Sequence, residues 1–550
     1  MDDALLSTND EVLNQPPPLE PYNLFASDRA LVEAVAREGA AWATDDLRAY
    51  GGRLGSPHAV RLGLLANRDV PRLHTHDRQG RRQDWVEFHP AYHELMALLV
   101  GQGLHASPWS DPKPGAQVHR AAGLYMSGQV EAGTSCPISM TYAAIPVLQK
   151  ASPQIRAWLP KLYSRAYDPG HRPLDEKSGG LVGMGMTEKQ GGSDVRSNLT
   201  RATPLAASGP GEAYRIDGHK WFMSAPMCDA FLVLAQAPCG LSCFFMPRWT
   251  PEGELNGLRF QRLKDKLGNR SNASSEVEFH AALGWLVGEE GRGVPTIIEM
   301  ANHTRLDNVV ASAGLQRQAL AQAIHHARHR TAFQRRLIDQ PLMSAVLADM
   351  ALEVEAATAL AFRLARAFDA EDDAGESRLR RLLTPAAKYW VCKRGPTLAA
   401  EALEVLGGNG YVEDSGLPRL YRELPVFSIW EGSGNVMCLD VERALRREPD
   451  AVDALAAELW PARGHDGALD ARIDQVLDAA RAGPSQARLR GWVRDLVVTL
   501  QAALLVRGAP ACVAEGFIAS RLGGDGGVFG TLPDGLALRE IVERAAPAGT

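Results

Sequence analysis

The sequence has few cysteines for its length and no cysteine pattern that would bind a metal or build a disulfide framework. Seven cysteines are scattered over 550 residues, and none forms a Cys-x-x-Cys pair. An odd number of isolated cysteines favours free thiols in a reducing, cytoplasmic compartment. His325 and His329 have metal-ligand spacing, with His326 and His303 nearby, but no Glu or Cys pattern accompanies them. We therefore predict no metal site.

Long apolar runs and a strong net charge are also absent. No stretch reaches the roughly 18 apolar residues of a transmembrane helix. The N-terminus lacks the basic and apolar regions of a secretory signal. The net charge of −6 argues against a dedicated nucleic-acid binder, although a local basic face is compatible with it. A cytoplasmic globular protein of about two to four domains is expected.

The patterning along the chain predicts four regions. Residues 1–180 have helical patterning broken by Pro and Gly clusters, after an N-terminal arm. Residues 181–292 contain short apolar runs and turn residues, which predict a small antiparallel β domain. Residues 293–445 return to helical patterning, and residues 446–550, rich in Ala and Leu, add further helices. The predicted fold is mainly α with a central β domain, because the strands are not interleaved with helices.

One helix is predicted in more detail. Between Met343 and Phe368, apolar residues recur every three or four positions, as on one stripe of a long helix. Pro341 suits the first turn of that helix. A second helix is expected over residues 306–330.

Residues 184–194 form the first segment with a chemical signal. Their glycines let the backbone approach a ligand closely, and the Thr187 and Ser193 hydroxyls can bond it. The segment is not a dinucleotide-binding fingerprint, because no Gly-x-Gly-x-x-Gly follows a strand and opens a helix. Taken alone, it is more typical of a turn-rich connector.

Two further segments combine aromatic and polar residues. Residues 218–224 place aromatics beside a hydroxyl, an arrangement that suits either a flat cofactor or ordinary core packing. Glu431 stands between Trp430 and Gly432. In an apolar wall such a carboxylate can act as a base, although a lone Glu is more often a solvated surface group.

Taken together and in this order, the three segments resemble the flavin-binding and catalytic segments of the acyl-CoA dehydrogenase superfamily. The resemblance implies an FAD cofactor. It also implies an N-terminal helical domain, a small antiparallel β-barrel or sandwich and a C-terminal four-helix bundle, here with an extra C-terminal helical domain. The residues that it assigns to the cofactor are Met184, Thr187, Gly192, Ser193, Phe222, Met223, Ser224, Arg330, Phe333, Glu404, Gly408, Trp430, Gly432, Ser433 and Asn435.

The resemblance also has departures and implications for assembly. Phe222 replaces the family's usual Trp, and Glu404 replaces its usual Gln. In the family, the arginine that matches Arg330 reaches the cofactor of a neighbouring subunit. The Arg330 contact therefore implies at least a dimer, and the resemblance as a whole implies a homotetramer.

The implied reaction is α,β-dehydrogenation of an acyl thioester with Glu431 as the base. Some family members carry the base on an earlier helix, but Thr304 occupies that position here. Arg305 and Arg443 match residues that line the substrate pocket. The acyl chain and the electron acceptor do not follow from the sequence.

Several segments resemble one branch more closely, the AidB-type alkylation-response proteins. They are residues 14–16, 136–141, 184–194, 263–274 and 427–435. That branch is associated with DNA binding through its C-terminal domain and with defence against alkylating agents. It offers a second hypothesis, a flavoprotein that binds double-stranded DNA.

The charge of the C-terminal region supports DNA binding only in part. Residues 441–550 contain 13 Arg, no Lys and 15 Asp plus Glu. Solvated helix faces that pair Arg with acids explain this composition at least as well as a phosphate-binding face. The candidate DNA contacts are Arg446, Arg447, Arg488, Arg490 and Arg494.

Overall fold

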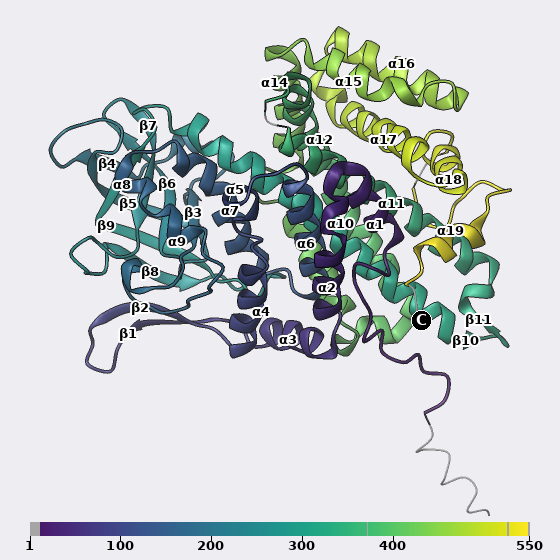
Figure 1. Cartoon of the computed structure of the whole chain (residues 1–550), viewed down its shortest axis with the longest axis horizontal. Coiled ribbons are helices and arrows are strands. Elements are labelled where there is room, and N and C mark those ends of the chain that lie inside the picture. Colours follow the sequence, from purple (N-terminus) through teal and green to yellow (C-terminus); the bar gives the residue numbers. More distant parts are fainter. Residues whose placement is uncertain (1–11, 371, 525–526, 548–550) are drawn as a thin grey trace, which may run out of the picture.

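The computed structural model describes residues 12–370, 372–524 and 527–547. The N-terminal part, up to the main sheet, is mostly helical (Figure 1). Its helices are α1 (Arg29–Val35), α2 (Thr44–Leu54), α3 (Pro57–Arg68), α4 (Pro90–Gly101), α5 (Ser107–Ser110), α6 (Ala116–Val130), α7 (Ser135–Gln149), α8 (Pro153–Arg156) and α9 (Leu159–Leu162).

A β-hairpin of β1 (Arg72–His76) and β2 (Arg82–Glu87) interrupts these helices, and the sequence patterning did not predict it. Its turn is built by Asp77, whose carboxylate accepts hydrogen bonds from the backbone N–H groups of Gln79 and Arg81, both at 2.9 Å. The strands are rich in polar side chains and largely half-exposed. They therefore lack the apolar alternation that would reveal a strand.

The main sheet has seven strands in the order β3-β5-β4-β6-β7-β9-β8. Most pairings are antiparallel, as predicted, but β3 and β4 each pair with β6 in parallel. The strands are β3 (Val182–Thr187), β4 (Arg201–Pro204), β5 (Ala213–Ser224), β6 (Ala230–Ala237), β7 (Gly240–Pro247), β8 (Leu258–Leu263) and β9 (Ser274–Val287).

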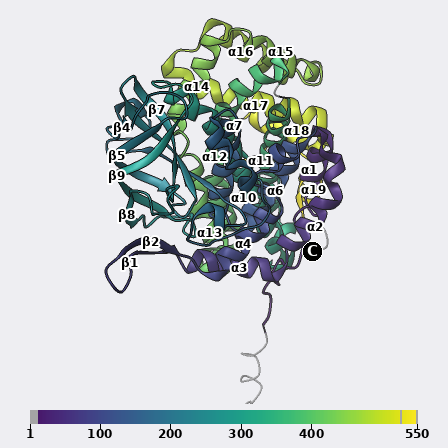
Figure 2. The same cartoon turned by 60° about the vertical axis from the view of Figure 1, so that its left-hand side comes forward.

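A bundle of long helices lies beside the sheet, with α10 at its centre (Figures 1 and 2). α10 packs against α6, α7, α11 and α12. The Arg120 guanidinium on α6 makes two hydrogen bonds, of 2.5 and 2.7 Å, to the Asp307 carboxylate on α10. The bundle consists of α10 (Gly293–His329), α11 (Pro341–Asp369), α12 (Ala374–Leu406), α13 (Leu417–Phe427) and α14 (Gly434–Arg447), with a short hairpin of β10 (Thr331–Ala332) and β11 (Arg335–Arg336) after α10.

α11 begins at Pro341 and covers the predicted apolar stripe, and its burial extends beyond that stripe. From Leu347 to Ala365 every residue is buried. Arginines from the C-terminal helices explain how its acids tolerate this burial: Arg521 pairs with Asp349 at 2.5 Å, and Arg544 pairs with Glu355 at 2.8 Å. Part of the C-terminal arginine content therefore serves internal packing.

The C-terminal helices cover one side of the bundle, where α17 packs against α11, α12 and α14 (Figure 2). These helices are α15 (Ala451–Leu459), α16 (Gly467–Ala482), α17 (Leu489–Gly508), α18 (Ala511–Arg521) and α19 (Leu538–Ala545). Within the described part of the chain, no helix combines the length and apolar character needed to cross a bilayer. The observed architecture is mainly α with a central β domain, as predicted.

Candidate functional site

The sheet brings the first two chemical segments together, although more than 20 positions separate them in the sequence. β3 and β5 are antiparallel, and their register pairs Met184 with Ser224 and Thr187 with Phe222. A register shift between these two pairs marks a β-bulge, which re-aims the side chains at the end of β3. The predicted cofactor residues of the two segments thus lie on neighbouring strands.

The loop that follows β3 folds back closely on Thr187. A Cβ atom at Gly192 would lie 2.4 Å from the Thr187 hydroxyl oxygen, so this position requires glycine. Ser193, next in the chain, is exposed, and Phe222 on β5 retains 47% of its accessible surface. Exposed hydroxyl and aromatic groups beside a tight glycine turn can receive a flat, polar cofactor.

Glu431 lies in the turn between α13 and α14. It has a φ of 58°, and Gly432 follows with a φ of 107°. A left-handed conformation at a non-glycine residue is strained, and it persists only where the surroundings hold it. Ser433 is the N-cap residue of α14, and Asn435 lies in the first turn of that helix.

Two buried cations hold this turn by its backbone. The Lys388 ammonium group donates to the carbonyl oxygens of Trp430, at 2.6 Å, and of Gly432. The Arg305 guanidinium donates to the Glu431 carbonyl oxygen at 3.1 Å. Lys388 was not predicted from the sequence, because a contact with backbone carbonyls leaves no motif.

Asp440 on α14 organises the arginines near this turn. Its carboxylate accepts hydrogen bonds from Arg305 at 2.8 Å, Arg381 at 2.8 Å and Arg443 at 2.9 Å. The neighbouring guanidinium groups hold the pKa of Asp440 below its usual value despite burial. Arg305 and Arg443, both predicted for the substrate pocket, therefore meet at one carboxylate that the sequence analysis did not single out.

The Glu431 side chain occupies a weakly solvated position. Burial raises its pKa, whereas Arg305, the Thr304 hydroxyl and Lys388 oppose that rise. Its Oε2 atom is buried and has no hydrogen-bond partner among the described residues. A carboxylate with a raised pKa and a free oxygen is suited to taking a proton from a bound substrate.

Cys136 on α7 lies near Glu431 and near Ser224 at the end of β5. Burial raises the pKa of its thiol to about 12, Lys266, Ser224 and Asn272 oppose the shift, and the charge of Glu431 adds to it. The thiol is therefore close to both Glu431 and Ser224, the residue predicted at the flavin edge. From the sequence, Cys136 is predicted only to be a free thiol within residues 136–141, one of the segments that resemble the AidB-type branch.

The polar groups near Glu431 and Cys136, which we call the candidate flavin wall, fit a cofactor that carries many hydrogen-bond donors and acceptors. Several of them are buried and have no hydrogen-bond partner within the described ranges. These are the Ser135 hydroxyl, both amide atoms of Asn272, and the Trp430 indole nitrogen. Buried polar atoms are costly unless something bonds them, so this wall suits a polar, planar group such as the isoalloxazine ring of FAD.

A second set of predicted cofactor residues lies far from Glu431 of the same chain. Arg330 ends α10, whereas Arg305 lies on it 25 positions earlier, which separates the two by about 37 Å along the helix. Phe333, in the β10–β11 hairpin, is 93% exposed at the end of the molecule away from the sheet (Figure 1). Glu404 and Gly408 stand at the end of α12.

The N-terminal arm binds this second set. The Arg330 guanidinium donates to the Asn14 carbonyl at 2.5 Å, and Asn409 donates to the Gln15 side chain at 3.0 Å. His325 makes a 2.8 Å hydrogen bond to the Pro17 carbonyl, and its ring lies 4.4 Å from that of His329. Two of the histidines with metal-ligand spacing thus pack beside the arm.

The arginines predicted to contact DNA have different surroundings. Arg490 donates to the Asn435 side-chain oxygen at 2.9 Å and lies over the Tyr389 ring, and Arg494 pairs with Asp495 at 2.8 Å. Arg446, Arg447 and Arg488 have no ion pair with any described residue. Of the five arginines, one therefore pairs with an acid, one contacts the first turn of α14, and three have no acidic partner among the described residues.

The family models matched by the chain cover most of its length. Residues 14–169 match the adaptive response protein AidB N-terminal domain, residues 183–282 the acyl-CoA dehydrogenase middle domain, and residues 291–446 the acyl-CoA dehydrogenase C-terminal domain.

Relatives and solved structures agree with these matches. The chain is 52% identical over 472 residues to the Escherichia coli K12 protein named "Putative acyl-CoA dehydrogenase AidB", covering 86% of each. It is 31% identical to acyl-CoA dehydrogenase family member 11 of Caenorhabditis elegans, over 80% of this chain and 73% of that one. The crystal structure of C. elegans ACDH-11 in complex with C11-CoA superposes with a TM-score of 0.83 at 26% identity, covering 98% of this chain and 92% of that chain. The chain therefore belongs to the acyl-CoA dehydrogenase family of FAD flavoproteins, in its AidB-like branch.

Proposed function

We propose that the protein is an FAD-dependent oxidoreductase that removes two hydrogen atoms from the α and β carbons of an acyl thioester. The observation that carries the proposal is Glu431, a carboxylate with a raised pKa and an unbonded buried oxygen beside the candidate flavin wall. The C. elegans structure bound to C11-CoA supports a thioester as the substrate class.

The protein's residues have separable tasks in this reaction. Glu431 takes the α proton, and its raised pKa makes the ionised form a stronger base than an ordinary carboxylate. Lys388 and Arg305 hold the turn so that the carboxylate stays aimed at the substrate. FAD, when bound, supplies the acceptor for the two electrons that leave with the β hydrogen.

A product analysis tests this proposal. The FAD-loaded protein is incubated with a panel of saturated acyl-CoA thioesters and an artificial electron acceptor, and the thioesters are analysed by mass spectrometry. Loss of two hydrogen atoms from one chain-length class supports the proposal and identifies the substrate class. Unchanged thioesters across the whole panel would contradict it.

We further propose that the cofactor site is completed by a second copy of the chain. Arg330 lies about 37 Å along α10 from Arg305, and Glu404 lies about 24 Å along α12 from Lys388, whereas Arg305 and Lys388 both bond the Glu431 turn. The near-complete exposure of Phe333 supports a contact with another subunit. A tetramer follows the family's pattern, and light scattering of the FAD-loaded protein measures it.

Arg490 provides a test of how the C-terminal helices serve the flavin site. Arg490→Gln removes the 2.9 Å bond that holds Asn435, so we expect FAD affinity to fall about three-fold or more. The matched control is Arg494→Gln, one turn further along α17, where the arginine pairs with Asp495 instead. Fluorescence titration of FAD should separate the two variants, and equal affinities would contradict a role for the Arg490 contact.

Binding of double-stranded DNA is the second candidate function, and Arg446, Arg447 and Arg488 favour it because they have no acidic partner within the described part of the chain. Three phosphate contacts predict a log–log salt slope of about −2.7, which weakens binding about 40-fold between roughly 50 and 200 mM salt. Anisotropy of a labelled duplex measures the slope. Substituting the three arginines by Gln should remove the salt dependence, and an unchanged slope would contradict this assignment.

A further inference from the structure

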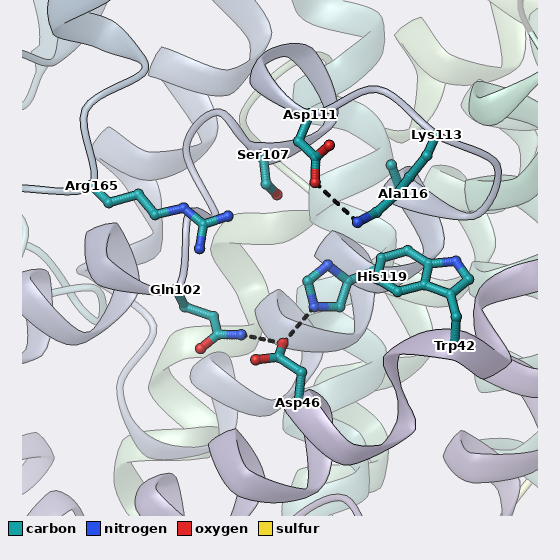
Figure 3. A pocket seen from close by; sticks show the side chains of 9 residues that line it. All are labelled: Trp42, Asp46, Gln102, Ser107, Asp111, Lys113, Ala116, His119 and Arg165. Carbon is teal, nitrogen blue, oxygen red and sulfur yellow. Dashed lines mark hydrogen bonds and ion pairs between the residues drawn. The ribbon is translucent and has the colours of Figure 1, made fainter.

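A polar pocket of about 170 Å³ lies among the N-terminal helices, apart from the Glu431 site (Figure 3). Five segments meet there: the start of α2, the end of α4, α5, the loop before α6 with the first turns of α6, and the chain after α9. No residue that lines it belongs to the Glu431 site. The volume equals that of about six water molecules in the liquid, or of one small organic acid.

The carboxylates of the pocket already have partners. Asp46 accepts hydrogen bonds from Gln102 at 2.6 Å and from His119 at 2.8 Å, and Lys113 donates to Asp111 at 2.9 Å. Figure 3 shows each of these bonds between two residues that line the pocket. The two acids are therefore engaged and do not supply a free cation site, and the described residues contain no cluster of metal-binding side chains.

Two hydrogen-bond donors that line the pocket have no partner among the described residues. Arg165 makes no ion pair or hydrogen bond with any described residue, and Figure 3 shows its guanidinium directed into the pocket. The Ser107 hydroxyl, 7% exposed as a residue, is buried without a partner. A free guanidinium beside a free buried hydroxyl matches the donor geometry that oxyanions require.

The backbone makes room for the Arg165 head group. Gly103 has a φ of 81°, and a Cβ atom there would lie 3.2 Å from Arg165 Nε. The neighbouring His105 fixes the segment before Arg165 by a 3.0 Å bond to the Ser164 carbonyl. The guanidinium is thus positioned by the fold, even though its residue is exposed to solvent.

The opposite wall carries Lys113 and His119. The Lys113 ammonium lies 4.1 Å from the centre of the Trp42 ring, and His119 packs against the same ring at 5.2 Å. Burial lowers the pKa of His119, Asp46 opposes that shift, and the charges of Lys113 and Arg165 add to it. The charges of Lys113 and Arg165 therefore both act on the His119 ring. The ring nitrogen that does not bond Asp46 faces the pocket in Figure 3.

We propose that this pocket binds a small oxyanion, a carboxylate or a phosphate, held by the Arg165 guanidinium and the Ser107 hydroxyl, beside the Lys113 ammonium and the His119 ring. The anion would bond the two donors that otherwise have no partner. This second ligand site goes beyond the dehydrogenase function and does not depend on it.

Isothermal titration of the FAD-loaded full chain tests the proposal. Potassium phosphate and sodium acetate are each titrated to about 20 mM, with potassium or sodium chloride of equal ionic strength as the reference. We expect saturable heat with one site per chain for at least one of the two anions. Binding of phosphate alone identifies a phosphate ligand, and binding of acetate alone identifies a carboxylate ligand.

Matched variants test whether the measured binding takes place in the pocket. Arg165→Gln should weaken binding about ten-fold or more, and Ser107→Ala should weaken it about three-fold. The control is Arg156→Gln, which changes an exposed arginine outside the pocket and should bind as the unaltered chain does. Lack of saturable heat with both anions would overturn the proposal, as would equal weakening by the Arg156 and Arg165 variants. Circular dichroism melting verifies that each variant is folded.

Discussion

Glu431→Gln is expected to slow reduction of the bound flavin by an acyl-CoA thioester about 10³- to 10⁴-fold. The amide keeps the size of the carboxylate but cannot take the α proton. FAD content and thioester binding should change little, because the backbone of Glu431 holds the turn through Arg305. Anaerobic stopped-flow absorbance measures the rate, and an unchanged rate would show that another group removes the proton.

The pH dependence of the same rate gives a second test of Glu431. Only the ionised carboxylate can accept the proton, and burial raises its pKa above the usual value. The rate should therefore increase with pH, reach its plateau only above that raised pKa, and decrease as pH falls. Glu431→Gln should abolish this acid limb, and an acid limb that survives would assign it to a different group.

Lys388→Met is expected to reduce the rate of flavin reduction about 100-fold while leaving the FAD content unchanged. Lys388 is 1% exposed and donates to the Trp430 carbonyl at 2.6 Å and to that of Gly432. These bonds hold Glu431 at a φ of 58°, a conformation that costs on the order of 1–3 kcal/mol. Without these bonds the Glu431 backbone relaxes to a less strained conformation, and the carboxylate no longer points toward the substrate.

A positioning role for Lys388 also predicts an alkaline limb. Burial lowers the pKa of Lys388 to about 8, with Glu431 among the groups that oppose the shift. The Lys388 ammonium is therefore fully charged well below pH 8, and the clamp weakens as pH rises through a pKa of about 8. Lys388→Met should lose this limb, whereas the control Lys150→Met, which removes an exposed lysine paired with Glu299, should keep both the limb and the rate. Equal losses in the two variants would contradict a specific clamp.

The sequence predicted best where physical periodicity and turn chemistry dominate. The stripe from Met343 to Phe368 and the helix-starting Pro341 predicted α11 almost in full. The stripe did not show that α11 is buried on all sides. Its acidic residues suggest a solvated face from the sequence alone, because their partners Arg521 and Arg544 lie more than 150 positions further along the chain. The β1–β2 hairpin was missed because its strands are polar and half-exposed.

In the candidate site, too, the features set by local sequence were predicted, and those set by contacts between distant segments were missed. Segments with glycines and hydroxyls in fixed order led to Thr187, Ser224 and Glu431, chiefly through resemblance to a family. Lys388 and Asp440 escaped notice because they act on backbone carbonyls and on arginines of other helices, which requires the three-dimensional arrangement. Arg490 was assigned to DNA by charge alone, whereas the fold places it against Asn435.

Anaerobic titration of the FAD-loaded protein with acyl-CoA thioesters of increasing chain length tests the dehydrogenase proposal most directly. Flavin absorbance near its visible maximum is followed after each addition. We predict bleaching within seconds by thioesters of one chain-length class and no bleaching of Glu431→Gln by the same compounds. An oxidised flavin spectrum that no thioester bleaches in the unaltered protein would contradict dehydrogenation and would favour DNA binding as the function of this fold.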